Sequence, residues 1–154
     1  WTLASAGFGL IAGLAVTLRH RLSFDSSVNL SPSMHWPEPV SVFEPHPDRG
    51  PVMITVEYRI KPEDVHEFSN AVHLFGKIRR RDGAVQWGIF TDVGDPYKYV
   101  ETFIVESWAE HLRQHERVTI ADREIEERVH SFHIGPDPPA VSHLIYSDEG
   151  LPHD

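Results

Sequence analysis

The chain has 154 residues, with 14 Lys and Arg against 23 Asp and Glu, which gives a net charge of −9. A protein that follows a phosphate backbone needs a basic surface, so this charge argues against nucleic acid as a partner. The sequence contains no cysteine, which excludes disulfides, thiolate chemistry and cysteine-type zinc sites. The length suits one modest domain with an additional segment.

The N-terminal stretch is apolar. Residues 1–18 contain no charged side chain, and the chain becomes basic at Arg19. Such a stretch is just long enough to cross a hydrocarbon core of about 30 Å. Small residues that favour packing between membrane helices recur at intervals of four, at Ser5, Gly9 and Gly13. We therefore expect residues 1–22 to be the end of a membrane-spanning helix whose C-terminal end faces the cytoplasm.

Two alternatives to a membrane helix are a signal peptide and a buried soluble helix. A signal peptide fits poorly, because no basic residue precedes the apolar run and no small-residue cleavage site is followed by a mature start. The chain also begins at Trp1 rather than Met, which indicates the tail of a longer protein.

A linker over residues 23–50 is predicted from its prolines, which oppose both helices and central strands. These prolines are Pro32, Pro37, Pro39, Pro45 and Pro47. We expect its large apolar side chains, Trp36 and Phe43, to pack on the surface of the following domain. Residues 148–154 are expected to be a frayed tail.

Residues 51–147 are predicted to form one α+β domain. Apolar alternation indicates strands, while apolar residues at intervals of three and four indicate helices. Ser107 with Glu110, and Thr119 with Asp122, have the spacing of capping boxes and predict two consecutive helices. The expected elements are strand 52–60, a helix from Pro62 to Asp82, strand 84–91, strand 99–105, helices 108–116 and 120–132, and strand 141–146. This βαββαβ order is typical of a ferredoxin-like domain.

Both faces of the predicted sheet carry apolar residues. Tyr99, Phe103 and Val105 point to one side of their strand, and Val100 and Ile104 point to the other. The helices of one chain can cover only one face, so we expect a second copy to cover the other. The expected assembly is a homodimeric α+β barrel.

His111 and His115 lie four residues apart on an otherwise apolar helix face that includes Trp108 and Leu112. A metal site would need a third ligand, such as Asp122 or Glu101, and nothing in the spacing brings either close. We favour one hydrogen-bonded core histidine and one that borders a groove. We assign no metal, no cofactor and no catalytic residue.

The remaining pocket candidates lie on strands. Trp87, Tyr99 and Trp108 could line an apolar pocket, although aromatic residues on strands are more often core. Glu57 and Glu101 could be partly buried acids beside an imidazole, or surface groups paired with Arg59. The candidate pocket therefore comprises His111, His115, Trp108, Trp87, Tyr99 and Glu101.

Several long strings of residues resemble one family. These are SPSMHWPEP (31–39), DRGPVMITVEYRI (48–60), RRRDGA (79–84) and YVETFIVESWAEHLRQHERVT (99–119). They resemble bacterial major-facilitator efflux proteins of the enterobactin-exporter type, also called transmembrane secretion effectors, that carry a C-terminal domain. By strand order and the Trp108–His115 pattern, this domain is similar to antibiotic-biosynthesis monooxygenases, which are dimeric barrels that act without metal or cofactor.

The resemblance implies the C-terminal part of an efflux transporter in the bacterial inner membrane. Its partners would be the remaining membrane helices, and its cytoplasmic domain would serve dimerisation, regulation or small-molecule sensing. The alternative is an enzyme, a cofactor-free monooxygenase in which His115 handles a proton. An enzyme would need a cavity of about a few hundred Å3 into which His115 projects.

Overall fold

The computed structural model describes residues 28–37, residue 39 and residues 45–147. The expected membrane helix over residues 1–22, the side chain of Phe43 and the tail over 148–154 lie outside the described residues. Within the described ranges, no helix is both long enough and apolar enough to span a bilayer.

The order of elements confirms the predicted ferredoxin-like fold. The chain forms β1 (Val52–Arg59), a short 3-10 turn η1 (Pro62–Asp64), α2 (Val65–Arg81), β2 (Gln86–Thr91), β3 (Lys98–Val105), α3 (Trp108–Arg117), α4 (Ile120–His130) and β4 (Ala140–Ile145). Two consecutive helices follow β3, as the capping residues predicted. The second of them ends at His130, two residues earlier than expected.

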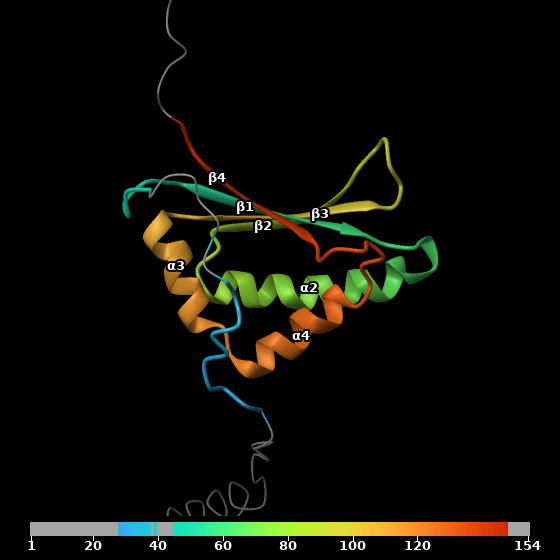
Figure 1. Ribbon diagram of the computed structural model, residues 1–154, viewed down its shortest axis with the longest axis horizontal. Helices are drawn as coiled ribbons and strands as arrows, with labels where there is room; N and C mark the ends of the chain where they lie inside the picture. Colours follow the sequence, from blue (N-terminus) through green and yellow to red (C-terminus); the bar gives the residue numbers. More distant parts are fainter. Residues whose placement is uncertain (1–27, 38, 40–44, 148–154) are drawn as a thin grey trace, which may run out of the picture.

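The four strands form an antiparallel sheet in the order β2-β3-β1-β4. Figure 1 shows all three α-helices on one face of this sheet. The register places Ile54 between Phe103 of β3 and His143 of β4. Residues opposite one another in a sheet point to the same side, so these three side chains all face the helices.

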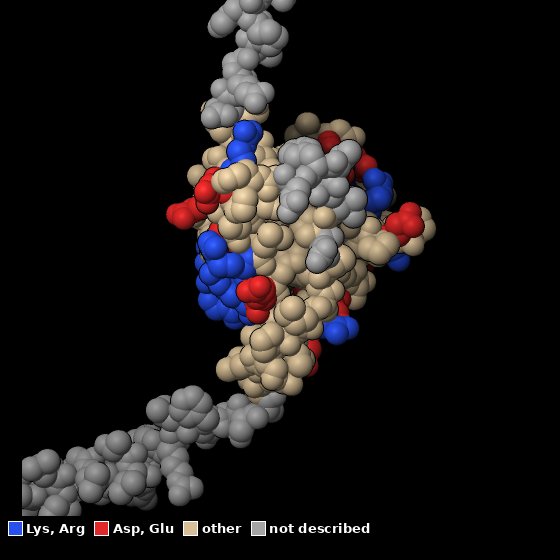
Figure 2. Space-filling model, turned by 60° about the vertical axis from the view of Figure 1, so that its left-hand side comes forward, with Lys and Arg blue, Asp and Glu red and all other residues tan. Residues whose placement is uncertain are grey.

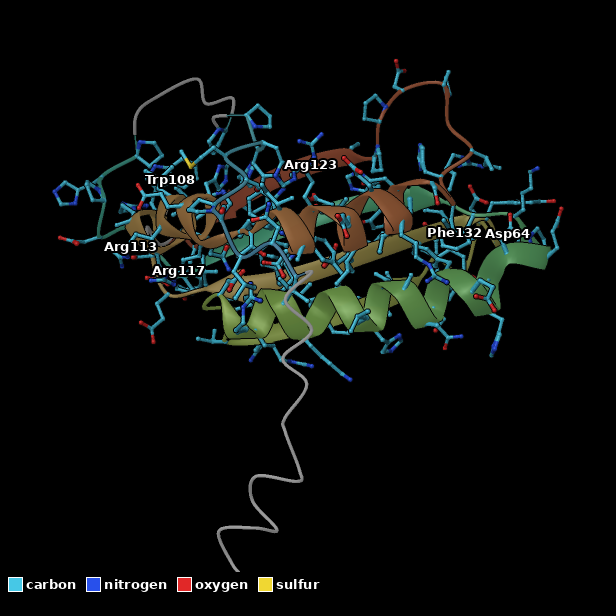
Figure 3. All side chains as sticks on the ribbon, turned by 90° about the horizontal axis from the view of Figure 1, so that it is seen from below. Asp64, Trp108, Arg113, Arg117, Arg123 and Phe132 are labelled. Atoms are coloured by element: carbon cyan, nitrogen blue, oxygen red, sulfur yellow. The ribbon has the colours of Figure 1, made fainter. Side chains whose placement is uncertain are left out.

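The core lies between the sheet and α2. Phe68, Val72 and Phe75, at helical spacing on α2, are almost fully buried against Val56 and Tyr58 of β1. Figure 3 shows α2 and α4 side by side, with the labelled Phe132 and Asp64 at the opposite end of the domain from Trp108.

Trp36 packs on this core from the linker side, which confirms the docking expected for it.

The other face of the sheet has no helix over it in the described part of the chain (Figure 1). Its exposed apolar side chains include Met53, Phe90 and Leu144, which are 36%, 60% and 53% exposed. Figure 2 shows the domain from the side rather than onto this sheet face, with Lys and Arg side chains gathered at one edge. A second copy over the free sheet face remains a prediction.

Both helix starts are capped as the sequence predicts. The hydroxyl of Ser107 accepts from the Glu110 amide at 3.2 Å, and Thr119 and Asp122 form a complete capping box. Glu110 does not reach back to the cap as expected. Its carboxylate pairs with Arg113 and Arg117 instead, because these cations lie one and two turns further along the same helix.

The prediction that Leu112 belongs to the buried face of α3 is wrong. Leu112 is 43% exposed, whereas Gln114 is buried. The buried residues Trp108, His111 and Gln114 follow one another at intervals of three, so the face that meets the sheet is rotated away from Leu112.

Candidate functional site

A cavity of about 470 Å3 lies between the helix-facing side of the sheet and the helices α3 and α4. Its wall also includes part of the linker, which we call the strap and define as residues 29–37. The lining side chains that matter below are Ile54, Val56, Phe103, Arg79, His111, His115, Glu126, His130, Val141, His143, His35 and Trp36.

Three imidazoles meet at one end of the cavity. His111 and His115 are one helical turn apart on α3, with ring centroids separated by 4.9 Å. His143 comes from β4, and its ring centroid is 4.7 Å from that of His111. The indole of Trp108 packs behind His111 at 5.4 Å. The histidine pair seen in the sequence is therefore part of a larger cluster.

His111 is buried without a polar partner. It is only 3% exposed, and neither ring nitrogen has a hydrogen-bond partner among the described residues. An unsatisfied buried polar group typically costs about 1–3 kcal/mol. The expected hydrogen-bonded core histidine is therefore not found at this position. Both ring nitrogens are enclosed by neighbouring side chains, and Oε1 of Gln114, three residues along α3, is a second buried polar atom without a partner among the described residues.

Four imidazoles at the cavity, those of His111, His115, His130 and His143, are held in their neutral form. Burial and, to a smaller extent, the neighbouring His143 together lower the pKa of His111 to about 3. Burial also lowers the pKa of His115 to about 4. The pKa values of His130 and His143 are lowered for the same reason, the loss of solvation of the charged form. At neutral pH, each ring therefore offers one donor and one acceptor.

Glu126 fastens the strap to α4. Its carboxylate accepts from the Trp36 indole at 2.7 Å and hydrogen-bonds His35 at 2.7 Å. The Trp36 ring also lies edge-on to His115, with centroids 5.1 Å apart, and under the guanidinium of Arg79 at 4.8 Å. The side chain of Trp36 thus contacts two other groups that line the cavity.

The profile of the transmembrane secretion effector family matches residues 1–150. The chain belongs to this family. It is therefore a segment of a transporter-related protein. No curated protein matches the chain.

Solved structures of similar fold are small monooxygenase-like domains. A protein from Caulobacter crescentus assigned as an antibiotic biosynthesis monooxygenase has 13% identity and a TM-score of 0.55, over 66% of this chain and 94% of that one. One from Bordetella bronchiseptica has 16% identity and a TM-score of 0.53, over 62% and 96%. A third, from Nitrosomonas europaea, has 14% identity and a TM-score of 0.50, over 70% and 97%. At these identities, the likeness shows the fold alone.

Of the six pocket candidates, the cavity wall includes His111 and His115. The other four lie outside the wall. Trp108 packs behind His111, and Tyr99 packs against Phe68 in the core, with ring centroids 5.5 Å apart. The other two, Trp87 and Glu101, belong to one buried polar cluster.

Glu101 is the centre of that cluster. Its carboxylate is fully buried and accepts from the Tyr58 hydroxyl at 3.0 Å, the Trp87 indole at 2.8 Å and the Arg79 guanidinium at 3.3 Å. Burial and the nearby Glu101 charge raise the pKa of Tyr58 well above its usual value. A carboxylate with three donors is satisfied, so its role is structural. Glu57 pairs with Lys98 rather than with Arg59.

The structure does not support the metal ligands considered from the sequence. Asp122 caps α4 and pairs with Arg81 at 2.7 Å, and Glu101 is occupied as described. Among the described residues, no group of three or more His, Asp or Glu side chains is arranged to hold a metal ion.

Several cavity residues are not apparent as site residues from the sequence. His143 stands on a short edge strand, and only the register of β1 with β4 brings it to His111. Glu126 did have a signal, because it lies four residues after Asp122 and three before Val129, on the buried side of α4. An acid on an apolar helix face indicates a buried partner, although not which one.

Proposed function

We propose that this chain is the C-terminal part of a membrane exporter whose ferredoxin-like domain binds a small molecule and thereby regulates the transporter. The observation that carries the proposal is a cavity of about 470 Å3 whose largely apolar wall includes the neutral imidazoles of His111 and His115. A ligand could hydrogen-bond to His115 directly, whereas the ring of His111 would have to shift, because both of its nitrogens are enclosed.

The cavity chemistry favours a flat, largely apolar ligand that carries hydroxyl groups. Phe103 and Trp36 supply aromatic walls, while the neutral imidazole of His115 supplies a hydrogen-bonding group. Arg79 lines the cavity, but its charge is already paired with Glu101, so it offers little net attraction to an anion. This combination of apolar walls with few polar groups is usual for small-molecule sites.

Two further parts of the proposal concern assembly and location. The free sheet face, with Phe90 and Leu144 exposed, supports a homodimer. The basic residues after the apolar N-terminal stretch support a cytoplasmic domain at the inner membrane. A reporter enzyme active only in the cytoplasm, fused after Asp154, tests the orientation. An inactive fusion that is still present in the membrane would contradict it.

The second candidate function is an enzyme of the monooxygenase type. The observation in its favour is that His115 lines a cavity of the size such an enzyme needs. Against it, a general base works best with a pKa near the operating pH, and burial lowers the pKa of His115 to about 4. At neutral pH, His115 is thus a weak proton acceptor. We therefore favour binding over turnover.

A ligand screen tests the proposal. The chain in detergent is heated with a panel of hydroxylated aromatic compounds and divalent metal salts, and the shift in melting temperature is measured. We expect stabilisation by aromatic alcohols that is lost in His111→Leu and retained in Leu112→Ala, a control at an exposed site on the same helix. Oxygen consumption with any stabilising compound would favour the enzyme. Equal stabilisation of all three proteins would contradict the proposed site.

A further inference from the structure

Residues that are far from the strap in the sequence hold it over the cavity. The Ser33 amide and hydroxyl both donate to the Val118 carbonyl, at 2.8 and 3.1 Å. Ile120 and Ala121 donate their amides to strap carbonyls, that of Ile120 to Ser31 at 2.9 Å. In Figure 1, the blue segment that contains the strap runs past the junction of α3 and α4. The strap thus pairs its backbone with the loop between these two helices.

The side chains of the strap add a second set of contacts, at the cavity itself. His35 is braced on both sides, by the Ser33 hydroxyl at 2.6 Å and by Glu126 at 2.7 Å. Trp36 donates to the same carboxylate and contacts the ring of His115. Glu126 is 7% exposed with the strap docked, so undocking would replace these hydrogen bonds by contacts with water.

We propose that the strap is a ligand-responsive element, fastened by Glu126, whose docking and the occupation of the cavity stabilise each other. Part of the cavity wall exists only while the strap is docked, because His35 and Trp36 belong to it. An occupant that contacts these side chains therefore binds the docked state more tightly than the undocked state. Binding shifts the equilibrium toward docking by that difference in affinity.

This coupling gives the proposed regulation a physical route, and it rests on the proposed function. The strap is continuous in sequence with residues 1–28, which contain the stretch expected to be a membrane helix. Docking of the strap on α3 and α4 shortens the free chain between that stretch and the domain. Occupation of the cavity would thus restrain the segment that leads to the membrane.

The test measures strap position and ligand affinity on the full chain in detergent. Because the chain has no cysteine, the substitutions Leu30→Cys and Lys77→Cys give two unique sites for nitroxide labels. Both replaced side chains are exposed. Pulsed electron paramagnetic resonance gives the distribution of distances between the labels. The ligand probe is 2-naphthol, a flat aromatic alcohol, and its affinity is measured by calorimetry.

We expect a narrow distance distribution in the parent chain and a broad one in Glu126→Ala. The affinity for 2-naphthol should fall at least about tenfold, because the substitution removes the hydrogen bonds of both His35 and Trp36 to the carboxylate. Saturating 2-naphthol should narrow the broad distribution again. Trp36→Phe keeps an aromatic ring but removes the indole donor. Its distance distribution should be broader than that of the parent chain and narrower than that of Glu126→Ala. The control Glu124→Ala removes an exposed carboxylate from the same helix and should change neither measurement.

Each contrary result would contradict one specific part of the proposal. An unchanged distribution in Glu126→Ala would overturn the role of Glu126 in fastening the strap. A broad distribution with unchanged affinity would overturn the coupling and leave the proposed function standing. Failure of 2-naphthol to bind the parent chain would count against both proposals. Melting temperatures of all variants show whether any of them has lost its fold rather than its strap contacts.

Discussion

The imidazoles of His111 and His143 lie with their ring centroids 4.7 Å apart, although one stands on α3 and the other on the edge strand β4. The pairing brings two neutral rings into a largely apolar surrounding at the wall of the cavity. His111 obtains no hydrogen bond from this arrangement. Since stability gains nothing from its polarity, the residue is a sensitive test of whether the cavity binds a ligand.

The first prediction is that His111→Leu leaves the free energy of unfolding at pH 7.5 unchanged or raises it by about 1 kcal/mol. Leucine has a similar volume and removes an unsatisfied polar group from a buried position. Urea denaturation of the chain measures this. A loss of more than about 2 kcal/mol would mean that His111 has a stabilising partner in the folded protein and would contradict our interpretation.

The second prediction concerns pH. The folded-state pKa values of His111 and His115, about 3 and about 4, lie below the value of about 6.5 expected in the unfolded chain. Between these pH values, the unfolded state binds more protons than the folded state. The contribution of the two histidines to the free energy of unfolding is therefore fully present above pH 6.5 and is lost as the pH falls. We expect a loss of at least about 2 kcal/mol between pH 6.5 and pH 4.5, at about 1.4 kcal/mol per pKa unit with allowance for partial relaxation.

The control for the pH dependence is His111→Leu, which should have a flatter profile over the same range. Carboxylates such as Asp122, whose pKa is lowered by Arg81 and Thr119 despite burial, lose their contribution only at lower pH. Urea denaturation at intervals of half a pH unit separates the pH range in which the histidines act from the lower range in which the carboxylates act. Parallel profiles for the parent chain and the variant would show that His111 does not titrate as its burial requires.

The third prediction is that Glu101→Ala destabilises the domain by about 3–5 kcal/mol. The substitution leaves the buried guanidinium of Arg79 without its carboxylate and removes the acceptor for Trp87. The matched control is Glu57→Ala, because Glu57 is a strand glutamate in a half-exposed ion pair with Lys98 and should lose less than about 1 kcal/mol. Similar losses in both variants would contradict a structural role specific to Glu101.

The fourth prediction concerns the free sheet face. A chain lacking residues 1–27 should sediment as a dimer at micromolar concentration. Phe90→Asp and Leu144→Asp should shift it to a monomer, because each places a charge in the apolar face that a second copy would cover. Leu74→Asp is the control, since Leu74 is 46% exposed on α2, outside that face. A monomeric parent chain at high micromolar concentration would rule out the dimer.

The sequence by itself determines the order of the elements and the residues at which α3 and α4 begin. Ser107, Thr119 and Asp122 mark helix starts through hydrogen bonds that span only three residues. Apolar periodicity along β1 and α2 also identifies the buried faces of these elements, because such patterns depend only on residues that are close in the chain. The prediction of a ferredoxin-like fold needed nothing beyond these local signals and the family resemblance.

Only the tertiary structure decided the site. His111 and His115 could be paired from the sequence because one helical turn separates them. His143 and Trp36 reach the same cavity through strand register and the docking of the strap, which local patterns do not encode. The same limit explains why Glu101 is a satisfied core acid instead of a pocket residue. Its three donors come from β1, α2 and β2, and tertiary packing alone brings these elements around it.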